Sequence, residues 1–152
     1  MTQEGNISAY MAGVADSDGS FTISKHKVDS TRRKFTYVGI FQLSWKKSNE
    51  SLAAMKSLKK TFGGYISDCK AYRTTFGSKP EVYKYSISGA DLDNFLYMII
   101  PHLKLKTRQA RALLNLRRLP RYFGAKGKSL SIYNKEDKLF NLVRSLNTKN
   151  GH

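Results

Sequence analysis

Two carboxylates at the end of a short predicted helix are the residues best placed to do chemistry. The helix is predicted over residues 7–19, and Asp16 and Asp18 lie in its last turn. The C-terminal end of a helix is already negative, so an anion there costs roughly 0.3–1 kcal/mol. Two acids at this position therefore call for a compensating cation. A divalent metal ion, which prefers hard oxygen ligands, would serve.

The same segment has two alternative interpretations. The run Asp-Ser-Asp-Gly-Ser also suits a polar turn between a helix and a strand, and local composition leaves that reading open. A calcium loop of the EF-hand type is excluded. If such a loop started at Asp16, it would need glycine where the chain has Phe21 and glutamate where it has Lys27.

The elements around these acids follow from the spacing of apolar residues. After the first helix, alternation predicts strands, and two strands precede the next helix. The expected strands cover residues 20–28, 35–45, 65–73 and 82–88, with a turn at 77–80 in the second hairpin. The expected later helices cover residues 50–61, 91–100, 107–119 and 135–146. The order αββαββα, with further helices, predicts an α+β fold in which helices cover one face of a four-stranded antiparallel sheet.

Composition limits the kind of protein this can be. The chain has 152 residues and a formal net charge of +16, which suits one domain over residues 1–152 and an anionic partner, nucleic acid first of all. The one cysteine, Cys69, excludes an intrachain disulfide. We expect no membrane span, because the longest apolar run falls far short of the roughly 18 residues needed. The absence of a targeting segment predicts an intracellular protein.

Two motifs resemble one family. The segment Met11-Ala-Gly-Val-Ala-Asp-Ser-Asp-Gly19 resembles the LAGLIDADG motif of the homing endonucleases, and Pro101-His-Leu-Lys-Leu-Lys106 resembles a second segment of that family. The resemblance covers residues 7–120, which leaves residues 121–152 as a C-terminal helical extension. It implies the family fold of order αββαββα and a site-specific DNA endonuclease. The short chain favours an intron-encoded protein, but the resemblance leaves an intein origin open.

The resemblance also assigns roles to residues. It makes Asp18 the metal-binding carboxylate, the Ser17 backbone carbonyl a second metal ligand, and Lys106 the lysine near the scissile phosphate. Asp16 becomes a less critical, structural acid. The implied metal is Mg²⁺, with Mn²⁺ as a substitute, since metal ions can activate water and neutralise phosphate charge.

The sequence departs from the family beyond the second strand. Trp45 stands where relatives often have a polar side chain such as glutamine, and Asn49 stands where an arginine or lysine is common. Lys46 or Lys47 could supply the missing cation, or ordered water could suffice.

The motif occurs once, so a second chain is needed to bring two copies of Asp18 together. We expect a homodimer that makes a double-strand break with 3′ overhangs in a long, near-palindromic target. Small residues on the motif helix would allow close helix packing, and the expected dimer interface consists of Ala9, Ala12, Gly13 and Asp16. The family implies action in an archaeal cytoplasm or in the organelle that encodes the protein.

Double-stranded DNA would lie across the sheet face that the helices leave free. Side chains of one parity are candidates for base contacts in the major groove, and basic residues in turns suit phosphates. The parity of the fourth strand stays open, since Tyr83, Tyr85 and Ile87 could face either side. The predicted DNA-binding residues are Thr22, Ser24, His26, Arg32, Arg33, Lys34, Gln42, Ser44, Lys46, Ser67, Cys69, Arg73, Lys84, Ser86 and Lys104.

A binding protein on the same scaffold is the alternative. It would be an intron RNA-splicing maturase, with RNA as its partner, or a DNA-binding protein that does not cut. The presence of both Asp18 and Lys106 favours the nuclease, because a protein that only binds has no need of the acid. A basic ribosome-associated protein would explain the charge but neither motif.

Overall fold

The computed structural model describes residues 3–30, 33–120 and 128–150. It confirms the α+β fold class and the predicted order of elements. The elements are α1 (Gln3–Ser17), β1 (Gly19–Ser30), β2 (Arg33–Lys46), α2 (Asn49–Phe62), β3 (Tyr65–Cys69), β4 (Tyr72–Thr74), β5 (Gly77–Lys79), β6 (Val82–Ser88), α3 (Gly89–Ile99), the 3₁₀ helix η1 (Ile100–His102), α4 (Thr107–Arg118) and α5 (Leu130–Asn150).

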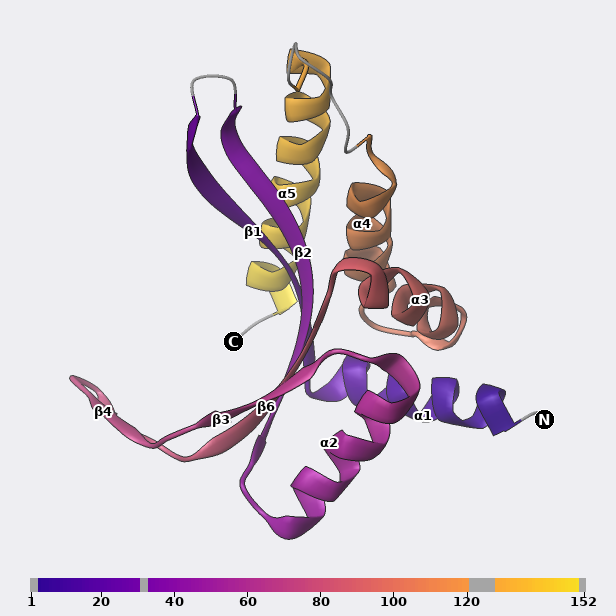
Figure 1. Cartoon of the computed structure of the whole chain (residues 1–152), viewed down its shortest axis with the longest axis vertical. Coiled ribbons are helices and arrows are strands. Elements are labelled where there is room, and N and C mark those ends of the chain that lie inside the picture. The colour runs from indigo at the N-terminus through magenta and orange to yellow at the C-terminus, as the bar shows by residue number, and fades with distance from the viewer. Residues whose placement is uncertain (1–2, 31–32, 121–127, 151–152) are drawn as a thin grey trace.

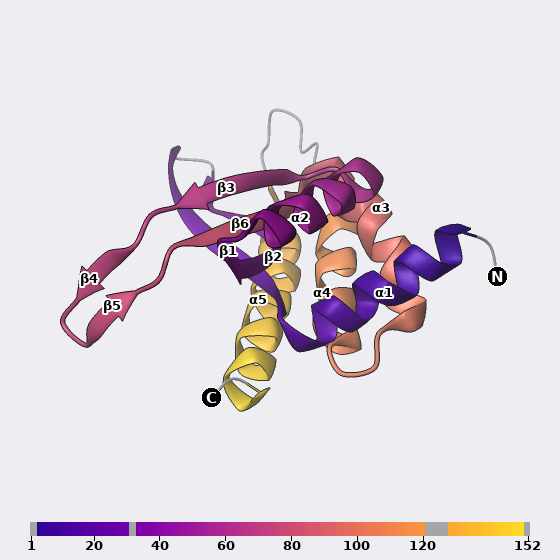
Figure 2. The ribbon, with the colours of Figure 1, turned by 90° about the horizontal axis from the view of Figure 1, so that it is seen from below.

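The main sheet has four antiparallel strands in the order β1-β2-β6-β3. Helices gather on one side of it, and β1 and β2 form a long ribbon that crosses the molecule (Figure 1). Seen at right angles, the small β4–β5 ribbon projects well beyond the helices (Figure 2). In the described part of the chain, no helix is long and apolar enough to cross a membrane.

Alternation along the strands builds the core. Phe21 and Phe41 point to the helices and are fully buried, with ring centroids 5.1 Å apart. Phe41 lies 4.8 Å from Phe95 of α3, and Phe62 of α2 meets Phe95 edge-on at 5.4 Å. Aromatic contacts of this geometry add to the gain from burial alone. This cluster joins α2 and α3 to the sheet.

The structure settles the parity of β6. Tyr85 and Ile87 are fully buried on the helix side, opposite Leu43 and Phe41 of β2. The Tyr85 hydroxyl donates a hydrogen bond of 2.6 Å to the Gly63 carbonyl, and burial raises the pKa of this phenol. The polar residues of β6 therefore lie on the free face.

The second hairpin differs from the prediction. β3 ends at Cys69, and the chain then forms the separate β4–β5 ribbon, whose turn lies at residues 75–76 rather than 77–80. The Thr74 side chain holds this turn, since its hydroxyl donates to the Gly77 carbonyl at 2.8 Å and accepts from the Phe76 amide at 3.3 Å. Such side-chain bonds to nearby backbone leave little trace in apolar periodicity.

The last helix, α5, is longer than the predicted range 135–146. Its polar side chains bind the sheet beyond the segment that its apolar residues mark. Asp137 accepts hydrogen bonds of 2.8 Å from both Lys25 and Tyr37, and Asn147 donates to the Phe21 carbonyl at 2.9 Å. These bonds lay α5 along β1, as Figure 1 shows. The first helix also begins earlier than predicted, at Gln3, and ends at Ser17.

Gly64 lies directly against the backbone of β6, and a substitution there tests this contact. Its φ is +82°, and a Cβ there would lie 2.5 Å from the Ser86 carbonyl oxygen. We expect Gly64→Ala to lower the free energy of unfolding by about 2 kcal/mol or more in denaturant titrations, because strain and a backbone clash add together. Gly77→Ala is the control, since its φ is +129° but nothing lies within 4 Å. Equal losses in both variants would contradict the clash.

Candidate active site and nucleic-acid face

The end of α1 carries the two acids, and they have different surroundings. The helix closes with a 2.8 Å hydrogen bond from the Asp18 amide to the Val14 carbonyl, and Gly19 then starts β1. A Cβ on Gly19 would lie 2.5 Å from the Phe41 ring and 2.9 Å from the Ala15 Cα, so the tight junction requires glycine. Asp18 is consequently held at the surface, where α1 meets the sheet.

Asp16 points back into its own chain. Its carboxylate accepts three backbone hydrogen bonds, from the amides of Lys104 at 2.8 Å, Leu105 at 3.1 Å and Lys106 at 3.0 Å. This fits the structural role inferred for Asp16, while its place in a dimer interface stays a prediction. The bonds tie the segment before α4 to the end of α1.

Lys106 lies at the same point. Its ammonium donates to the carbonyls of Gly19 at 2.6 Å and Ala15 at 3.1 Å. Burial lowers the pKa of Lys106 below its ordinary value, and the charges of Asp16 and Asp18 oppose that shift. A cation at a helix C-terminus is favourable, so Lys106 supplies part of the compensation that the two acids need.

Trp45 contacts Asp18, which the sequence did not reveal. The indole Nε1 donates a hydrogen bond to Asp18 Oδ2 at 3.2 Å. The alternation of β2 places Trp45 on the helix side of the sheet, but nothing in that pattern shows which end of α1 it meets. Lys47 is not free to replace a missing catalytic cation, because its ammonium is paired with Asp68 and lies 3.9 Å from Glu81.

The donor set suits part of a metal site. Among the described residues, no group of three or more His, Cys, Asp or Glu side chains could hold a metal ion. Asp18 offers an exposed carboxylate, and the Ser17 carbonyl lies where helix carbonyls have no intrahelical partner. These are hard oxygen donors of the kind Mg²⁺ prefers. A complete site needs further oxygens from outside one chain.

The free face of the sheet is largely polar, although Val38, Ile40, Tyr65 and Val82 also lie on it, and it carries most of the predicted DNA-binding residues. Strand register puts Gln42 opposite Ser86, and Lys84 opposite Ser67, on one face. Exposed or half-buried members of the predicted set on this face are Thr22, Ser24, His26, Gln42, Ser44, Lys46, Ser67, Cys69 and Lys84. Ser86 shares the face but is fully buried, so neighbouring side chains shield it from any ligand.

The remaining predicted DNA-binding residues lie elsewhere. Arg73 is exposed on β4 of the projecting ribbon, and the side chain of Lys104 is exposed beside the site. Arg32 lies outside the described residues, as do the side chains of Arg33 and Lys34.

The motif helix presents only part of the predicted dimer surface. Ala9 and Gly13 are exposed, and a Cβ on Gly13 would have nothing within 4 Å. Ala12 is fully buried against the protein's own core, so it faces inward rather than toward a partner. A small residue suits both a dimer interface and a tightly packed core, so residue type alone could not show that Ala12 belongs to the core.

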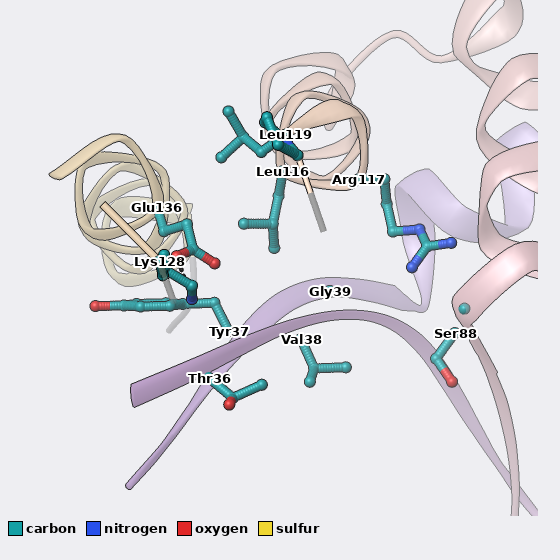
Figure 3. A pocket seen from close by; sticks show the side chains of 12 residues that line it. Thr36, Tyr37, Val38, Gly39, Ser88, Leu116, Arg117, Leu119, Lys128 and Glu136 are labelled. Carbon is teal, nitrogen blue, oxygen red and sulfur yellow. Dashed lines mark ion pairs between the residues drawn. The ribbon is translucent and has the colours of Figure 1, made fainter. Parts of the chain in front are cut away.

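A cavity of about 390 Å³ lies away from this site, between β2 and the helices α4 and α5. Figure 3 shows Tyr37, Leu116 and the Lys128–Glu136 ion pair around it. Arg117, also at its wall, forms a two-pronged bond with Asp93 at 2.6 and 2.8 Å. Its charged groups already have partners and neither Asp18 nor Lys106 lines it, so the cavity is not the candidate active site.

Removal of the negative charge should change the free energy of unfolding differently at Asp16 and at Asp18. We expect Asp16→Ala to lower the free energy of unfolding by about 1–3 kcal/mol, because three backbone amides lose their acceptor. Asp18→Asn should leave it unchanged or raise it by up to about 1 kcal/mol, because an exposed anion leaves a helix C-terminus. Denaturant titrations compare the two. A larger loss in Asp18→Asn would contradict this division of roles.

Comparisons with known proteins agree with this geometry. The search of curated proteins gave no match. Among solved structures, the homing endonuclease I-CvuI in complex with its target has a TM-score of 0.71 at 20% identity, over 94% of this chain and 83% of that one. The archaeal intron-encoded homing endonuclease I-Vdi141I, complexed with DNA, has a TM-score of 0.68 at 17% identity, over 95% and 86%.

A longer protein shares the fold as well. The meganuclease I-SmaMI, bound to DNA, has a TM-score of 0.65 at 18% identity, over 87% of this chain but only 42% of that one. The sequence profile of the LAGLIDADG endonucleases matches residues 11–119, which include the C-terminal half of α1, the sheet and α4. The chain therefore belongs to the LAGLIDADG endonuclease family.

Proposed function

We propose that this protein is a site-specific homing endonuclease that cuts double-stranded DNA with the help of Mg²⁺. The observation that carries the proposal is the convergence of Asp18 and Lys106 at the end of α1, beside a polar sheet face. Segments 88 residues apart in the sequence meet there through the Asp16 and Lys106 hydrogen bonds. The DNA would lie across the free face, and the cut would fall near Asp18.

The charge distribution supports DNA on this face. Among the strand residues whose side chains the structure describes, no aspartate or glutamate lies on the free face. On the helix side, by contrast, acids are paired with cations, as in Lys25–Asp137 and Arg117–Asp93. A face without carboxylates, on a chain of net charge +16, suits a phosphate backbone.

Each residue of the site has a part in this proposal. Asp18 and the Ser17 carbonyl would hold the metal ion, which when bound activates water and neutralises phosphate charge. Lys106 would stabilise the negative charge that builds up on the scissile phosphate. Its hydrogen bonds to the carbonyls of Ala15 and Gly19 hold its ammonium at the site before DNA binds. Mn²⁺, which also accepts oxygen ligands, would replace Mg²⁺.

A homodimer would complete the site. One chain supplies one suitable carboxylate, and the exposed side of α1 presents Asn6, Ala9, Tyr10, Gly13 and Ser17 at helical spacing. Two such surfaces could pack closely about a twofold axis and bring two Asp18 residues together. The target would then be near-palindromic, and cutting both strands would leave 3′ overhangs.

Cleavage by Asp18 is tested with a selection from a randomised DNA library in Mg²⁺. We expect the wild type to cut a long, near-symmetric site and Asp18→Asn to lose cleavage by at least about 10³-fold while it keeps its DNA affinity. DNA binding without any cut by the wild type would point instead to a binding protein or maturase.

Two further variants sharpen this test. Glu50→Gln, on exposed α2, is the control and should cut like the wild type. Lys106→Ala should slow single-turnover cleavage by about 10²-fold with little effect on affinity. If Asp18→Asn still cuts in Mg²⁺, the site assignment is wrong.

The dimer is tested at Gly13. Because nothing lies within 4 Å of a Cβ there, Gly13→Leu should leave the fold of one chain intact but block close helix packing between chains. We expect light scattering to show a dimer for the wild type and a monomer for Gly13→Leu. Ala53→Leu, at an exposed position of α2, is the matched control and should remain dimeric. A monomeric wild type, with and without DNA, would refute the proposed dimer.

A further inference from the structure

The hydrogen bond between Trp45 and Asp18 joins two segments 27 residues apart in the sequence. The indole Nε1 donates to Asp18 Oδ2 at 3.2 Å, and Trp45 is the only tryptophan in the chain. Within the described ranges, Oδ1 of the same carboxylate accepts no hydrogen bond. One oxygen of Asp18 is thus held and the other is open.

The position of the indole is set by the rest of the fold. Trp45 lies near the end of β2, opposite Tyr83 of β6, and its ring is partly buried against the core. The neighbouring Lys47 ties the same end of β2 to β3 and to the start of β6 through Asp68 and Glu81. The donor therefore approaches Asp18 from a rigid strand, whereas Asp18 itself is exposed.

Indole chemistry limits what Trp45 can do. Its N–H is a donor only, so it cannot ligate a metal ion, accept a proton or hold a water through a lone pair. Any effect on the reaction must pass through Asp18. An exposed aspartate at a helix C-terminus is repelled by the helix dipole and otherwise free to rotate, so one fixed donor restricts its rotamers.

We propose that Trp45 is a positioning residue, which holds Asp18 with Oδ1 open toward the metal ion before DNA binds. The inference rests on the proposed metal-binding role of Asp18. Hydrogen bonds from neighbouring groups commonly orient metal ligands, and their loss costs about 10–100-fold in metal affinity. Here the outer partner is an aromatic donor, and Lys106 supplies the nearby positive charge that an indole lacks.

The single indole N–H gives a direct spectroscopic reporter. In a ¹H–¹⁵N spectrum of the full chain, we expect its one side-chain resonance to shift in Asp18→Asn, since the bond to Oδ2 changes. Added Mn²⁺ should broaden this resonance in the wild type and leave it sharp in Asp18→Asn. An indole resonance that does not respond to Asp18→Asn would overturn the proposed contact itself.

The positioning role is tested by Mn²⁺ affinity, measured from the electron paramagnetic resonance of free Mn²⁺. We expect Trp45→Phe to weaken Mn²⁺ binding about 10-fold. Replacement of Trp45 by benzothienylalanine keeps the ring shape and should give the same loss, which separates the missing N–H from any change in packing. Tyr83→Phe, which alters the cross-strand neighbour without touching Asp18, should bind Mn²⁺ like the wild type.

The possible outcomes are distinct. Wild-type Mn²⁺ affinity in the benzothienylalanine protein would overturn the positioning role while leaving the proposed endonuclease intact. Equal Mn²⁺ affinity in the wild type and Asp18→Asn would instead overturn the metal site on which both proposals rest. If cleavage failed but the Trp45 variants lost Mn²⁺ affinity as expected, the inference about Trp45 would stand without the nuclease.

Discussion

The junction at the end of α1 is the constraint on which the rest of this structure depends. A helix that ends in two acids is electrostatically unfavourable by itself. The chain resolves this by giving each acid its own partners: Asp16 takes three backbone amides before α4, and Asp18 takes the Trp45 indole. Lys106 adds a positive charge on the free carbonyls of Ala15 and Gly19. The same contacts that offset the repulsion assemble the candidate site.

This junction also connects the two layers. α1 runs directly into β1 through Gly19, whose missing side chain lets Phe41 pack against the turn. Phe41 in turn belongs to the aromatic cluster that holds α3 to the sheet. A shift of the core would therefore move Asp18 relative to the free face. Because the core side of the sheet is closely packed, the strands are held in place, and the positions of the residues on the free face are fixed as well.

Local patterns predicted the elements well where neighbours in the sequence decide the position of a side chain. Alternation in β1 and β2 placed Thr22 and Gln42 on the free face, and the register of the strands agrees. Patterns did less well where a distant partner decides. Ser86 has the right parity but is buried, and Ala12 has the right size for an interface but packs into the core. The turn of the second ribbon was misplaced because Thr74, not a glycine-rich run, closes it.

The sequence by itself determined the family and the order of the elements, and its two motifs singled out Asp18 and Lys106 as the candidate acid and lysine. Only the tertiary structure decided that three backbone amides occupy the Asp16 carboxylate, whereas the exposed Asp18 carboxylate accepts one bond from Trp45. Asp16 and Asp18 differ by two positions and share the same chemistry, but one points toward residues 104–106 and the other toward solvent and Trp45. That difference arises from contacts between segments far apart in the chain, and such contacts have no signature in local spacing.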